Sequence, residues 1–347
     1  MKIVQCMFAK GKGGLEQVFV DHTKTLKAAG FEIFPICNCK GSYKENVAEA
    51  AGREPILISN TRKLNPFFGW KFARAVMQIQ PDIVFLHGNR AISMCLSRFV
   101  KKKLPENTKI CATTHNYRNK LFTGLDASLV ISRDLEEKLK CRAIPSERIF
   151  YFPNAVRLEP PKEFHFHSPP VIGTMRRLHH EKGCDVLLKA CGILKQRGIE
   201  FSLVVGGEGE QRQSLEDLCS ELGIEDSVSL PGWVKNKEKF FSEIDIFCMP
   251  SRKEGLPVAL LEAMSFGKPC ITTNLPGPSE AINKNGGGII IEKENPEKLA
   301  DALEKIIINE DFAAGLGQKA RQTVRDEYSF EMQKKRLSDI CERIVRL

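Results

Sequence analysis

The chain has 347 residues, 42% of them hydrophobic and 27% charged, with a formal net charge of +9 at pH 7. At about 150 residues per domain this length predicts two globular domains, and the composition excludes pervasive disorder, collagen and coiled coil. No stretch approaches the ~18 uninterrupted apolar residues that a membrane-spanning helix needs. Gln5 and Lys10 interrupt the apolar run at the N-terminus, which is not a secretion signal. We expect a cytoplasmic protein.

The basic surplus is confined to the first half of the chain. Residues 1–160 carry 26 Lys and Arg against 14 Asp and Glu, a formal charge of +12, whereas residues 161–347 carry 26 against 29, or −3. Such asymmetry indicates an anionic partner for the first half: a membrane surface, an anionic glycan or nucleic acid. A charge that serves solubility alone is the alternative.

The 12 cysteines are scattered and include no Cys-x-x-Cys pair. Disulfide scaffolds are typical of short secreted chains, and zinc sites usually need two spaced pairs. We therefore expect free thiols in a reducing compartment, most of them buried as small apolar residues.

Short apolar runs alternate with amphipathic segments along the whole chain. This repetition predicts parallel sheets covered by helices on both faces, and two such sets predict two doubly wound domains. The expected strands are 2–8, 31–37, 82–87, 109–115, 127–132, 148–153, 170–175, 201–206, 227–232, 244–250, 269–273 and 287–292. The expected helices are 15–29, 66–80, 90–103, 133–142, 184–197, 210–222, 258–266 and 297–309.

The domain junction is the Pro-rich, aperiodic stretch 157–170, which is typical of a linker. We place an N-terminal domain at 1–160 and a C-terminal domain at 168–330. The chain ends in an amphipathic helical region, 310–346, that Tyr328 to Phe330 break in two.

Two further stretches need an interpretation. His165 and His167 form an i,i+2 pair in the linker, but no Cys or carboxylate cluster is near them, so we assign no metal to them. Residues 40–65 are expected to form an extended linker.

Several nucleotide and hydrolase motifs are absent. The sequence has no G-x-G-x-x-G after its first strand, no G-x-x-x-x-G-K-[ST] and no G-x-S-x-G. It also has no Asp-x-Asp to hold a metal against a diphosphate. A nicotinamide dehydrogenase, a P-loop enzyme and an α/β-hydrolase are therefore disfavoured.

The first strand runs into a glycine turn before a helix. Gly13 and Gly14 allow a ligand to approach the backbone closely, and the N–H groups at the helix start favour an anion, beside Lys10 and Lys12. A tight turn without a ligand is the alternative.

The second half opens in the same way, with a strand followed by a basic loop. Arg176, Arg177 and Lys182 lie beside the carboxyl end of that strand, where doubly wound sheets bind ligands. These cations would neutralise a diphosphate without a metal. The alternative is a solvated basic loop.

A strand, a loop and a helix follow one another in residues 250–273. Glu254 lies in the loop, and Gly255, Leu256 and Pro257 lead into a helix in which Glu262 has apolar neighbours. A carboxylate in such a setting is costly unless it is paired or binds a ligand, and it suits the vicinal hydroxyls of a ribose. A surface carboxylate pair is the alternative.

A series of motifs runs through both halves and resembles the retaining glycosyltransferases of family 4, over nearly the whole chain. The C-terminal motifs are Arg177-Leu178 with Lys182-Gly183, Gly206-Gly207-Glu208-Gly209, Pro231-Gly232-Trp233-Val234, Pro250-Ser251, Glu254-Gly255, Leu261-Glu262-Ala263 and Gly267-Lys268-Pro269. The N-terminal motifs are Gly13-Gly14 with Glu16, and His115-Asn116.

The resemblance implies an α/β fold of the GT-B type, in which two Rossmann-like, doubly wound domains face a central cleft. It implies that the helix at 331–347 packs back on the N-terminal, acceptor-binding domain and that the C-terminal domain binds the donor. Arg177 and Lys182 would bind the donor diphosphate with no metal and no cofactor. Glu262 would bind the ribose, and Glu254 would contact the transferred sugar.

The other implied contacts come from loops. Gly13 and Gly14, with Gly255 to Pro257, would close on the phosphates, and Gly232 to Val234 would line the base pocket. His115 would lie near the 6-position of the sugar and the reacting centre; taken alone it would be a structural histidine. Two positions depart from the family pattern: Arg176 and Ala155 each replace a usual glycine.

The implied activity is metal-independent, retaining transfer of a hexose or N-acetylhexosamine. The donor would be a nucleotide diphosphate sugar. We expect a UDP-linked sugar, with GDP-mannose as the other option. The acceptor would be a glycan or a lipid-linked molecule such as lipopolysaccharide core or O-antigen. The basic N-terminal domain, with Lys101 to Lys103, would suit the inner membrane surface, and Phe67, Phe68 and Trp70 would touch lipid or pack in the core.

Two other functions stay open at this point. One is a GT-B nucleotide-sugar epimerase, and the other is a non-enzymatic basic protein that binds a membrane or nucleic acid. Glu254 and Glu262 argue against the second, since carboxylates repel a phosphate backbone, and we expect no nucleic-acid partner.

Overall fold

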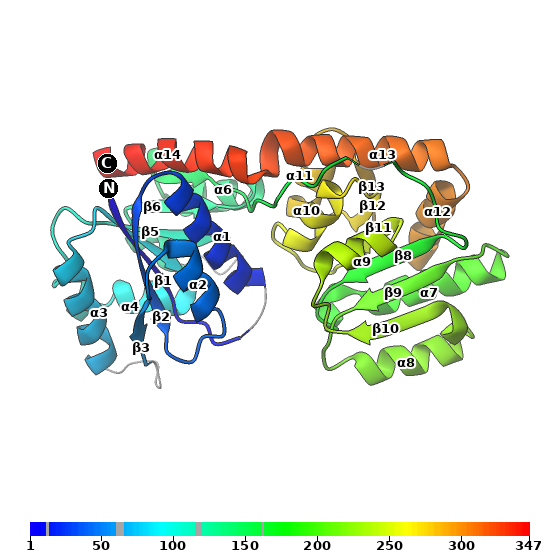
Figure 1. Ribbon diagram of the computed structural model, residues 1–347, viewed down its shortest axis with the longest axis horizontal. Helices are drawn as coiled ribbons and strands as arrows, with labels where there is room; N and C mark the ends of the chain where they lie inside the picture. Colours follow the sequence, from blue (N-terminus) through cyan, green and yellow to red (C-terminus); the bar gives the residue numbers. More distant parts are fainter. Residues whose placement is uncertain (12–13, 60–65, 115–119, 162) are drawn as a thin grey trace. The chain divides into compact units, whose positions relative to one another are not determined.

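The computed structural model describes all residues except 12–13, 60–65, 115–119 and 162, and the chain forms two compact units (Figure 1). The N-terminal unit is Met1–Asn154 with Phe330–Leu347, and the C-terminal unit is Ala155–Ser329. The first boundary lies at Asn154 rather than at residue 160, because the segment after Asn154 bonds to the C-terminal unit. Val156 forms a bridge with Ser329, and Arg321 donates to the carbonyl of Glu159.

The N-terminal unit is built on a sheet of seven parallel strands, with strand order β3-β2-β1-β4-β5-β6-β7. Its strands are β1 (Lys2–Met7), β2 (Glu32–Asn38), β3 (Ile56–Ile58), β4 (Ile83–His87), β5 (Lys109–Thr114), β6 (Ala127–Val130) and β7 (Ile149–Tyr151). The apolar runs are buried strands because a parallel sheet is covered on both faces.

The helices of this unit include the last one of the chain, α14 (Phe330–Arg346), which lies beside α1 (Gly14–Ala28) (Figure 1). Thr25 Oγ1 donates to Gln333 Oε1 at 2.8 Å, and Leu337 and Ile340 of α14 belong to the same apolar core as Ile3 of β1. The other helices are α2 (Lys44–Ala51), α3 (Pro66–Ile79), α4 (Asn89–Cys95), α5 (Arg98–Lys101), η1 (Lys120–Gly124), α6 (Arg133–Lys140) and η2 (Ser146–Arg148).

Two expectations for this unit were wrong. Residues 40–65 contain α2, which buries Val47 and Ala51, and β3, which pairs with β2; both elements are too short for a periodic pattern to reveal. Residues 90–103 form two helices, α4 and α5, because the helix ends at Leu96 and Ser97 begins the next one in an extended conformation.

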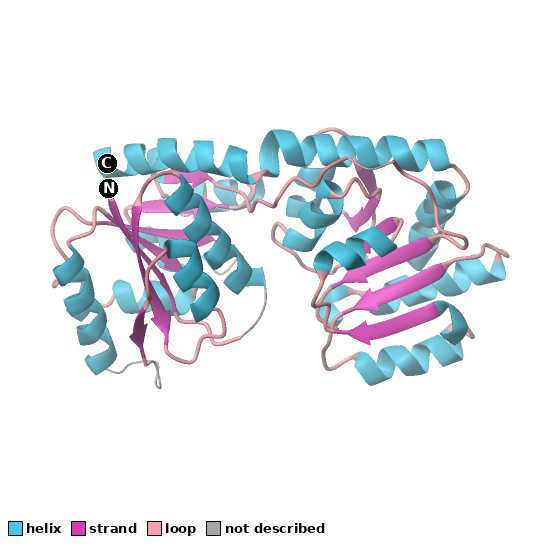
Figure 2. Ribbon diagram, in the orientation of Figure 1, coloured by secondary structure: helices cyan, strands magenta, loops and turns pink. Residues whose placement is uncertain are grey.

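The C-terminal unit has six parallel strands with order β10-β9-β8-β11-β12-β13. This is the strand order of a Rossmann domain. Successive strands are added to one side of β8 up to β10 and then, from β11, to its other side, so the order reverses between β8 and β11. Figure 2 shows strands in magenta and helices in cyan. The strands are β8 (Val171–Met175), β9 (Ser202–Gly206), β10 (Val228–Gly232), β11 (Ile246–Met249), β12 (Cys270–Thr273) and β13 (Gly288–Ile291).

The helices of this unit cover the sheet and share one apolar core with it. They are η3 (His180–Lys182), α7 (Cys184–Gln196), α8 (Arg212–Glu221), η4 (Glu225–Ser227), α9 (Lys237–Glu243), α10 (Val258–Ser265), α11 (Pro276–Asn283), α12 (Pro296–Ile307), α13 (Glu310–Thr323) and the π-helical turn η5 (Val324–Tyr328). The predicted break in the last helical region is present at Ser329. Among the helices of the described ranges, none is both long and apolar enough to cross a bilayer.

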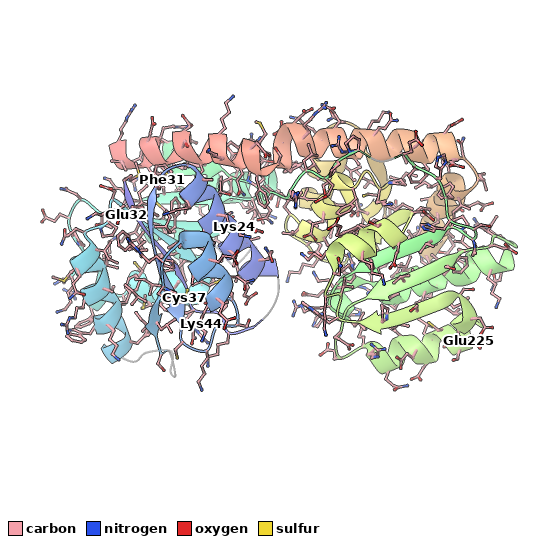
Figure 3. The ribbon with its side chains drawn as sticks, viewed as in Figure 1. Lys24, Phe31, Glu32, Cys37, Lys44 and Glu225 are labelled. Atoms are coloured by element: carbon pink, nitrogen blue, oxygen red, sulfur yellow. The ribbon has the colours of Figure 1, made fainter. Side chains whose placement is uncertain are left out.

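The cysteines are free, as expected, and ten of the twelve are buried. Cys37 of β2, labelled in Figure 3, is one of them, and burial raises the pKa of its thiol to about 12. Lys24 of α1, in the same view, is exposed. The buried thiols therefore act as small apolar side chains at neutral pH.

Candidate functional site

The strand order of the C-terminal unit brings two predicted loops together. β8 pairs with β11 through Ile172 and Ile246, although β9 and β10 lie between them in the sequence. The loop 176–183 follows the carboxyl end of β8, and the loop 250–257 follows the carboxyl end of β11. These loops therefore meet at the point where the strand order reverses, which is where doubly wound sheets bind ligands.

A glycine allows the two loops to touch. Gly183 has a φ of +67°, and a Cβ there would collide with the carbonyl oxygen of Pro250. Gly207, which follows β9, has a φ of +140° and lies equally close to the carbonyl oxygen of Arg176. A side chain at Gly183 would force the two loops apart, and one at Gly207 would push the segment after β9 away from Arg176. Both glycines therefore set the shape of the site.

The loops are joined by an ion pair between two of the predicted site residues. Lys182 Nζ lies 2.7 Å from Glu254 Oε1, and the side chains are 18% and 12% exposed. The hydroxyl of Ser251 donates to the same carboxylate oxygen at 2.9 Å. A lysine has three N–H donors and Lys182 directs one at Glu254, so a bound anion would find the others available.

Arg176, predicted as one of three diphosphate-binding cations and as a departure from a usual glycine, instead joins this internal network. Its Nη1 donates to Ser251 Oγ at 2.9 Å and to the carbonyl oxygen of Lys182. Its Nε is buried and has no hydrogen-bond partner among the described residues. Arg176 thus connects the loop that carries Lys182 to the loop that carries Glu254.

Arg177 has the opposite orientation. Its side chain is exposed, and none of the hydrogen bonds and ion pairs found within the described ranges involves its guanidinium. Neighbouring residues at the end of a strand point to opposite sides, which explains why one arginine is used inside the protein and the next is available to a ligand.

Glu262 of α10 is paired differently. Lys237 Nζ, at the start of α9, donates to Glu262 Oε1 at 2.6 Å. The second oxygen, Oε2, is buried without a hydrogen-bond partner among the residues described. Burial raises the pKa of this carboxyl above its ordinary value of 4.5, and Lys237 partly counters that rise. A buried carboxylate oxygen without a donor costs free energy that a ligand hydroxyl would recover.

Two backbone segments named in the sequence analysis lie at the ends of strands in this unit. Gly255, Leu256 and Pro257 lead directly into α10, for which Pro257 is the N-cap residue. Gly232 ends β10 with a φ of +82°, and its carbonyl accepts from the N–H of Gly207 at 2.7 Å. The loop from Gly232 to Val234 therefore borders the same strand ends as Gly207.

The predicted N-terminal residues are described only in part. Gly14 is the first residue of α1, and a Cβ built on it meets no atom within 4 Å. Gly13 and His115 lie outside the described residues, although His115 directly follows β5 in the sequence. Their proposed contacts stay predictions.

The linker histidines bind carboxylates. His165 Nδ1 lies 3.0 Å from Glu310 Oε1, and His167 Nδ1 lies 2.8 Å from the buried Asp245. Among the described residues, no three His, Cys, Asp or Glu side chains cluster in a way that could hold a metal ion.

Sequence reasoning missed Lys237, named Ser251 only within a family motif, and expected Arg176 to face a diphosphate rather than Ser251. Ser251 and Arg176 follow strand ends, which was a usable signal, since side chains at these positions meet at one edge of the sheet. Lys237 gave no such signal, because its contact with Glu262 depends on how α9 packs beside α10.

Two family models match the chain in succession. Residues 12–160 match the model described as Glycosyltransferase Family 4, and residues 156–323 match the model of Glycosyl transferases group 1. The chain is built of two glycosyltransferase domains. The second match contains Lys182, Glu254 and Glu262, so the network above lies inside a glycosyltransferase domain.

Two relatives of the chain are glycosyltransferases named for the biosynthesis of amylovoran and of lipopolysaccharide core. The amylovoran biosynthesis glycosyltransferase AmsK of Erwinia amylovora is 31% identical over 65% of the chain, which spans 58% of AmsK. The lipopolysaccharide core biosynthesis glycosyltransferase LpsE of Rhizobium meliloti is 23% identical over 95% of the chain and 96% of LpsE.

Solved structures share the fold. Anabaena Alr3699/HepE, crystallised in complex with UDP, superposes with a TM-score of 0.83 over 99% of the chain and 100% of HepE, at 14% identity. The architecture is thus the expected GT-B type, with two parallel-sheet α/β domains.

Proposed function

We propose that this glycosyltransferase transfers a hexose or N-acetylhexosamine from a UDP-linked sugar to a glycan or lipid-linked acceptor, with retention of configuration and without a metal. The observation that carries the proposal is the buried Oε2 of Glu262, which has no donor among the described residues. A ribose hydroxyl is a donor of the right kind, and a carboxylate takes hydrogen bonds from vicinal hydroxyls on its two oxygens. The UDP complex of HepE and the lipopolysaccharide role in the name of LpsE support the choice of donor and acceptor.

The diphosphate would lie between the basic loop and α10. Arg177 offers an exposed guanidinium, and Lys182 is held in place by Glu254 at 2.7 Å. The N-terminus of α10 adds a positive dipole end at the same edge of the sheet. Two side-chain cations and a helix N-terminus neutralise a diphosphate without a divalent ion.

The reaction is a substitution at the anomeric carbon. The bond from C1 to the phosphate oxygen breaks, and a bond from C1 to the acceptor oxygen forms on the same face. The acceptor hydroxyl proton passes to the leaving phosphate oxygen, so no protein base is needed. Arg177 and Lys182 stabilise the charge that develops on the diphosphate, while Glu254 and His115 position the sugar and the reacting centre.

A thermal-shift experiment tests the donor site. We expect UDP and UDP-sugars to raise the melting temperature, equally with and without EDTA, because a ligand at 100 times its Kd adds about 2.7 kcal/mol of stability. Glu262→Ala should remove most of this shift while the free enzyme stays folded. If GDP or ADP gave the larger shift, the assignment of uridine would be wrong. If no nucleotide raised the melting temperature, the assignment of the donor site would be wrong.

The matched control is Glu304→Ala, which removes a helical carboxylate of α12 that is paired with Arg197 at 2.7 Å. Its nucleotide shift should equal that of the wild type. A Glu262→Ala shift as large as the control's would remove Glu262 from the donor site. A product assay then separates transfer from epimerisation. A transferase releases UDP when an acceptor is present and forms no epimer of the donor sugar.

A further inference from the structure

One face of the N-terminal unit exposes large apolar side chains. Trp70 and Met77 of α3 are 41% and 48% exposed, and Phe99 of α5 is 46% exposed. The opposite side of α3 is apolar as well, with Phe68 and Phe72 buried. Exposed apolar side chains that are grouped and bordered by polar ones mark a surface for a partner, and no described segment of the chain buries Trp70 and Met77.

The exposed side chains of the two helices are neighbours. Gly69 allows α5 to approach α3, since a Cβ there would lie 3.0 Å from Val100 and 3.8 Å from Phe99. A hollow of about 390 Å³ lies on α3 and is lined by Trp70, Met77 and Lys103, among others. We call this surface the α3–α5 face. It consists of Trp70, Met77 and Phe99 together with the lysines and arginines of α3 and of residues 98–103.

The cations of this face lack carboxylate partners. They are Lys71, Arg74, Arg98, Lys101, Lys102 and Lys103, all of them exposed. Neither α3 nor residues 98–104 contain an acidic residue, and no ion pair within the described ranges involves these cations. Their charge is therefore available to anions outside the chain.

We propose that the α3–α5 face docks on an anionic lipid bilayer, with Trp70, Met77 and Phe99 in the interfacial region and the lysines and arginines on lipid phosphates. Aromatic side chains with a polar edge favour the boundary between acyl chains and headgroups, and long cationic side chains reach from an apolar surface to the headgroups. Each Lys or Arg near an anionic membrane adds about fivefold to binding.

The rings argue against nucleic acid as the partner. Base stacking needs an open ring face, but Arg74 lies 5.3 Å from the Trp70 ring centroid and Lys103 lies 5.1 Å from that of Phe99. Met77 offers no ring to a base. Of the two options for Phe68, packing in the core is confirmed and contact with lipid is wrong, because Phe68 is 5% exposed; the side chain of Phe67 lies outside the described set.

Vesicle sedimentation of the full chain tests this docking. We expect binding to vesicles with 30% phosphatidylglycerol, little binding to pure phosphatidylcholine, and weakening with added salt. Arg74→Gln with Lys103→Gln should lower the partition coefficient about 25-fold, and Trp70→Ser with Phe99→Ser should lower it at least tenfold. Two control variants should bind like the wild type. Lys293→Gln with Lys298→Gln makes the same charge change in the C-terminal unit. Ile308→Ser removes an apolar side chain of that unit that is 69% exposed.

Tryptophan fluorescence gives a second readout, because the chain has only Trp70 and Trp233. In a Trp233→Phe background, anionic vesicles should shift the emission of Trp70 to the blue. Three outcomes would each overturn the proposal. They are an unchanged emission of Trp70, an equal loss of vesicle binding in the control variants, and preferential binding to a single-stranded oligonucleotide. The UDP thermal shift of the α3–α5 variants should stay intact, which separates this docking from the donor site.

Discussion

Two lysine–glutamate pairs lie beside the strand ends of the C-terminal unit, and they are satisfied to different degrees. Glu254 accepts hydrogen bonds from Lys182 and Ser251, and Arg176 in turn supports Ser251. Glu262 has only Lys237 on one oxygen and nothing among the described residues on the other. We call Lys182–Glu254, whose bonded oxygen has two donors, the closed pair. We call Lys237–Glu262, which has a buried oxygen without a donor among the described residues, the half-open pair.

The difference indicates different tasks. The pair of Lys182 and Glu254, whose Oε1 takes two hydrogen bonds, fixes two loops and the cation before a substrate arrives. Such preorganisation is what transition-state stabilisation requires. A buried carboxylate oxygen without a donor lowers stability until a ligand supplies one. The pair of Lys182 and Glu254 is thus suited to chemistry, and the pair of Lys237 and Glu262 is suited to recognition.

Breaking the closed pair should have the largest effect. Lys182→Ala removes the cation proposed to lie next to the leaving phosphate and leaves Glu254, 12% exposed, without its ion partner. We expect kcat to fall about 10²- to 10³-fold, measured as UDP release from the donor sugar. Lys253→Ala in the neighbouring loop, with a side chain 58% exposed, is the control and should retain full turnover. Turnover within threefold of the control in Lys182→Ala would contradict a role in catalysis.

Loosening the closed pair should have a smaller effect. Arg176→Ala removes the donor to Ser251 and to the carbonyl of Lys182, and we expect kcat/KM to fall about tenfold, or about 1.4 kcal/mol. Because Arg176 positions Lys182, the loss should appear in kcat more than in KM, and Arg176→Lys should restore part of it. Arg197→Ala, which breaks two ion pairs on α7, should leave both constants unchanged. A loss of melting temperature with unchanged kinetics would make Arg176 a purely structural residue.

The half-open pair should show itself in the pH dependence of UDP binding. Because burial raises the pKa of Glu262 above 4.5, acidification should protonate it and weaken UDP binding while an ordinary glutamate would still be charged. In the free protein the sign is opposite: a raised pKa makes Glu262 favour folding at pH values below its titration, and this contribution is lost as the pH rises through it.

Lys237→Ala sharpens this test. Lys237 lowers the pKa of Glu262, so its loss should move the midpoint of UDP binding to higher pH and weaken binding at pH 7 about threefold, the scale of a half-exposed ion pair. Calorimetric titration from pH 5 to pH 8 measures both effects. Glu262→Gln should remove the pH dependence, and a dependence that persists in it would assign the titration to another group.

The sequence predicted most strands and the position of the site on the chain. Apolar runs separated by amphipathic helices determine a parallel α/β architecture, because such strands can be buried only between layers of helices. Lys182 and Glu254 could be singled out because each lies in a segment that follows a strand end, where doubly wound sheets bind ligands. Glu262 could be singled out because it is a carboxylate among apolar residues of a helix. The short elements α2 and β3 were missed, since three to eight residues carry too little periodicity to stand out.

The tertiary structure alone decided the partners of these residues. Lys182 and Glu254 are 72 positions apart and meet because packing places β8 beside β11. Arg176 turns inward while Arg177 faces solvent, since one step along the backbone reverses the direction of a side chain. The amino-acid sequence determined which charges this glycosyltransferase carries and on which loops; the order of the strands determined which charges are neutralised inside the protein and which are left for a ligand.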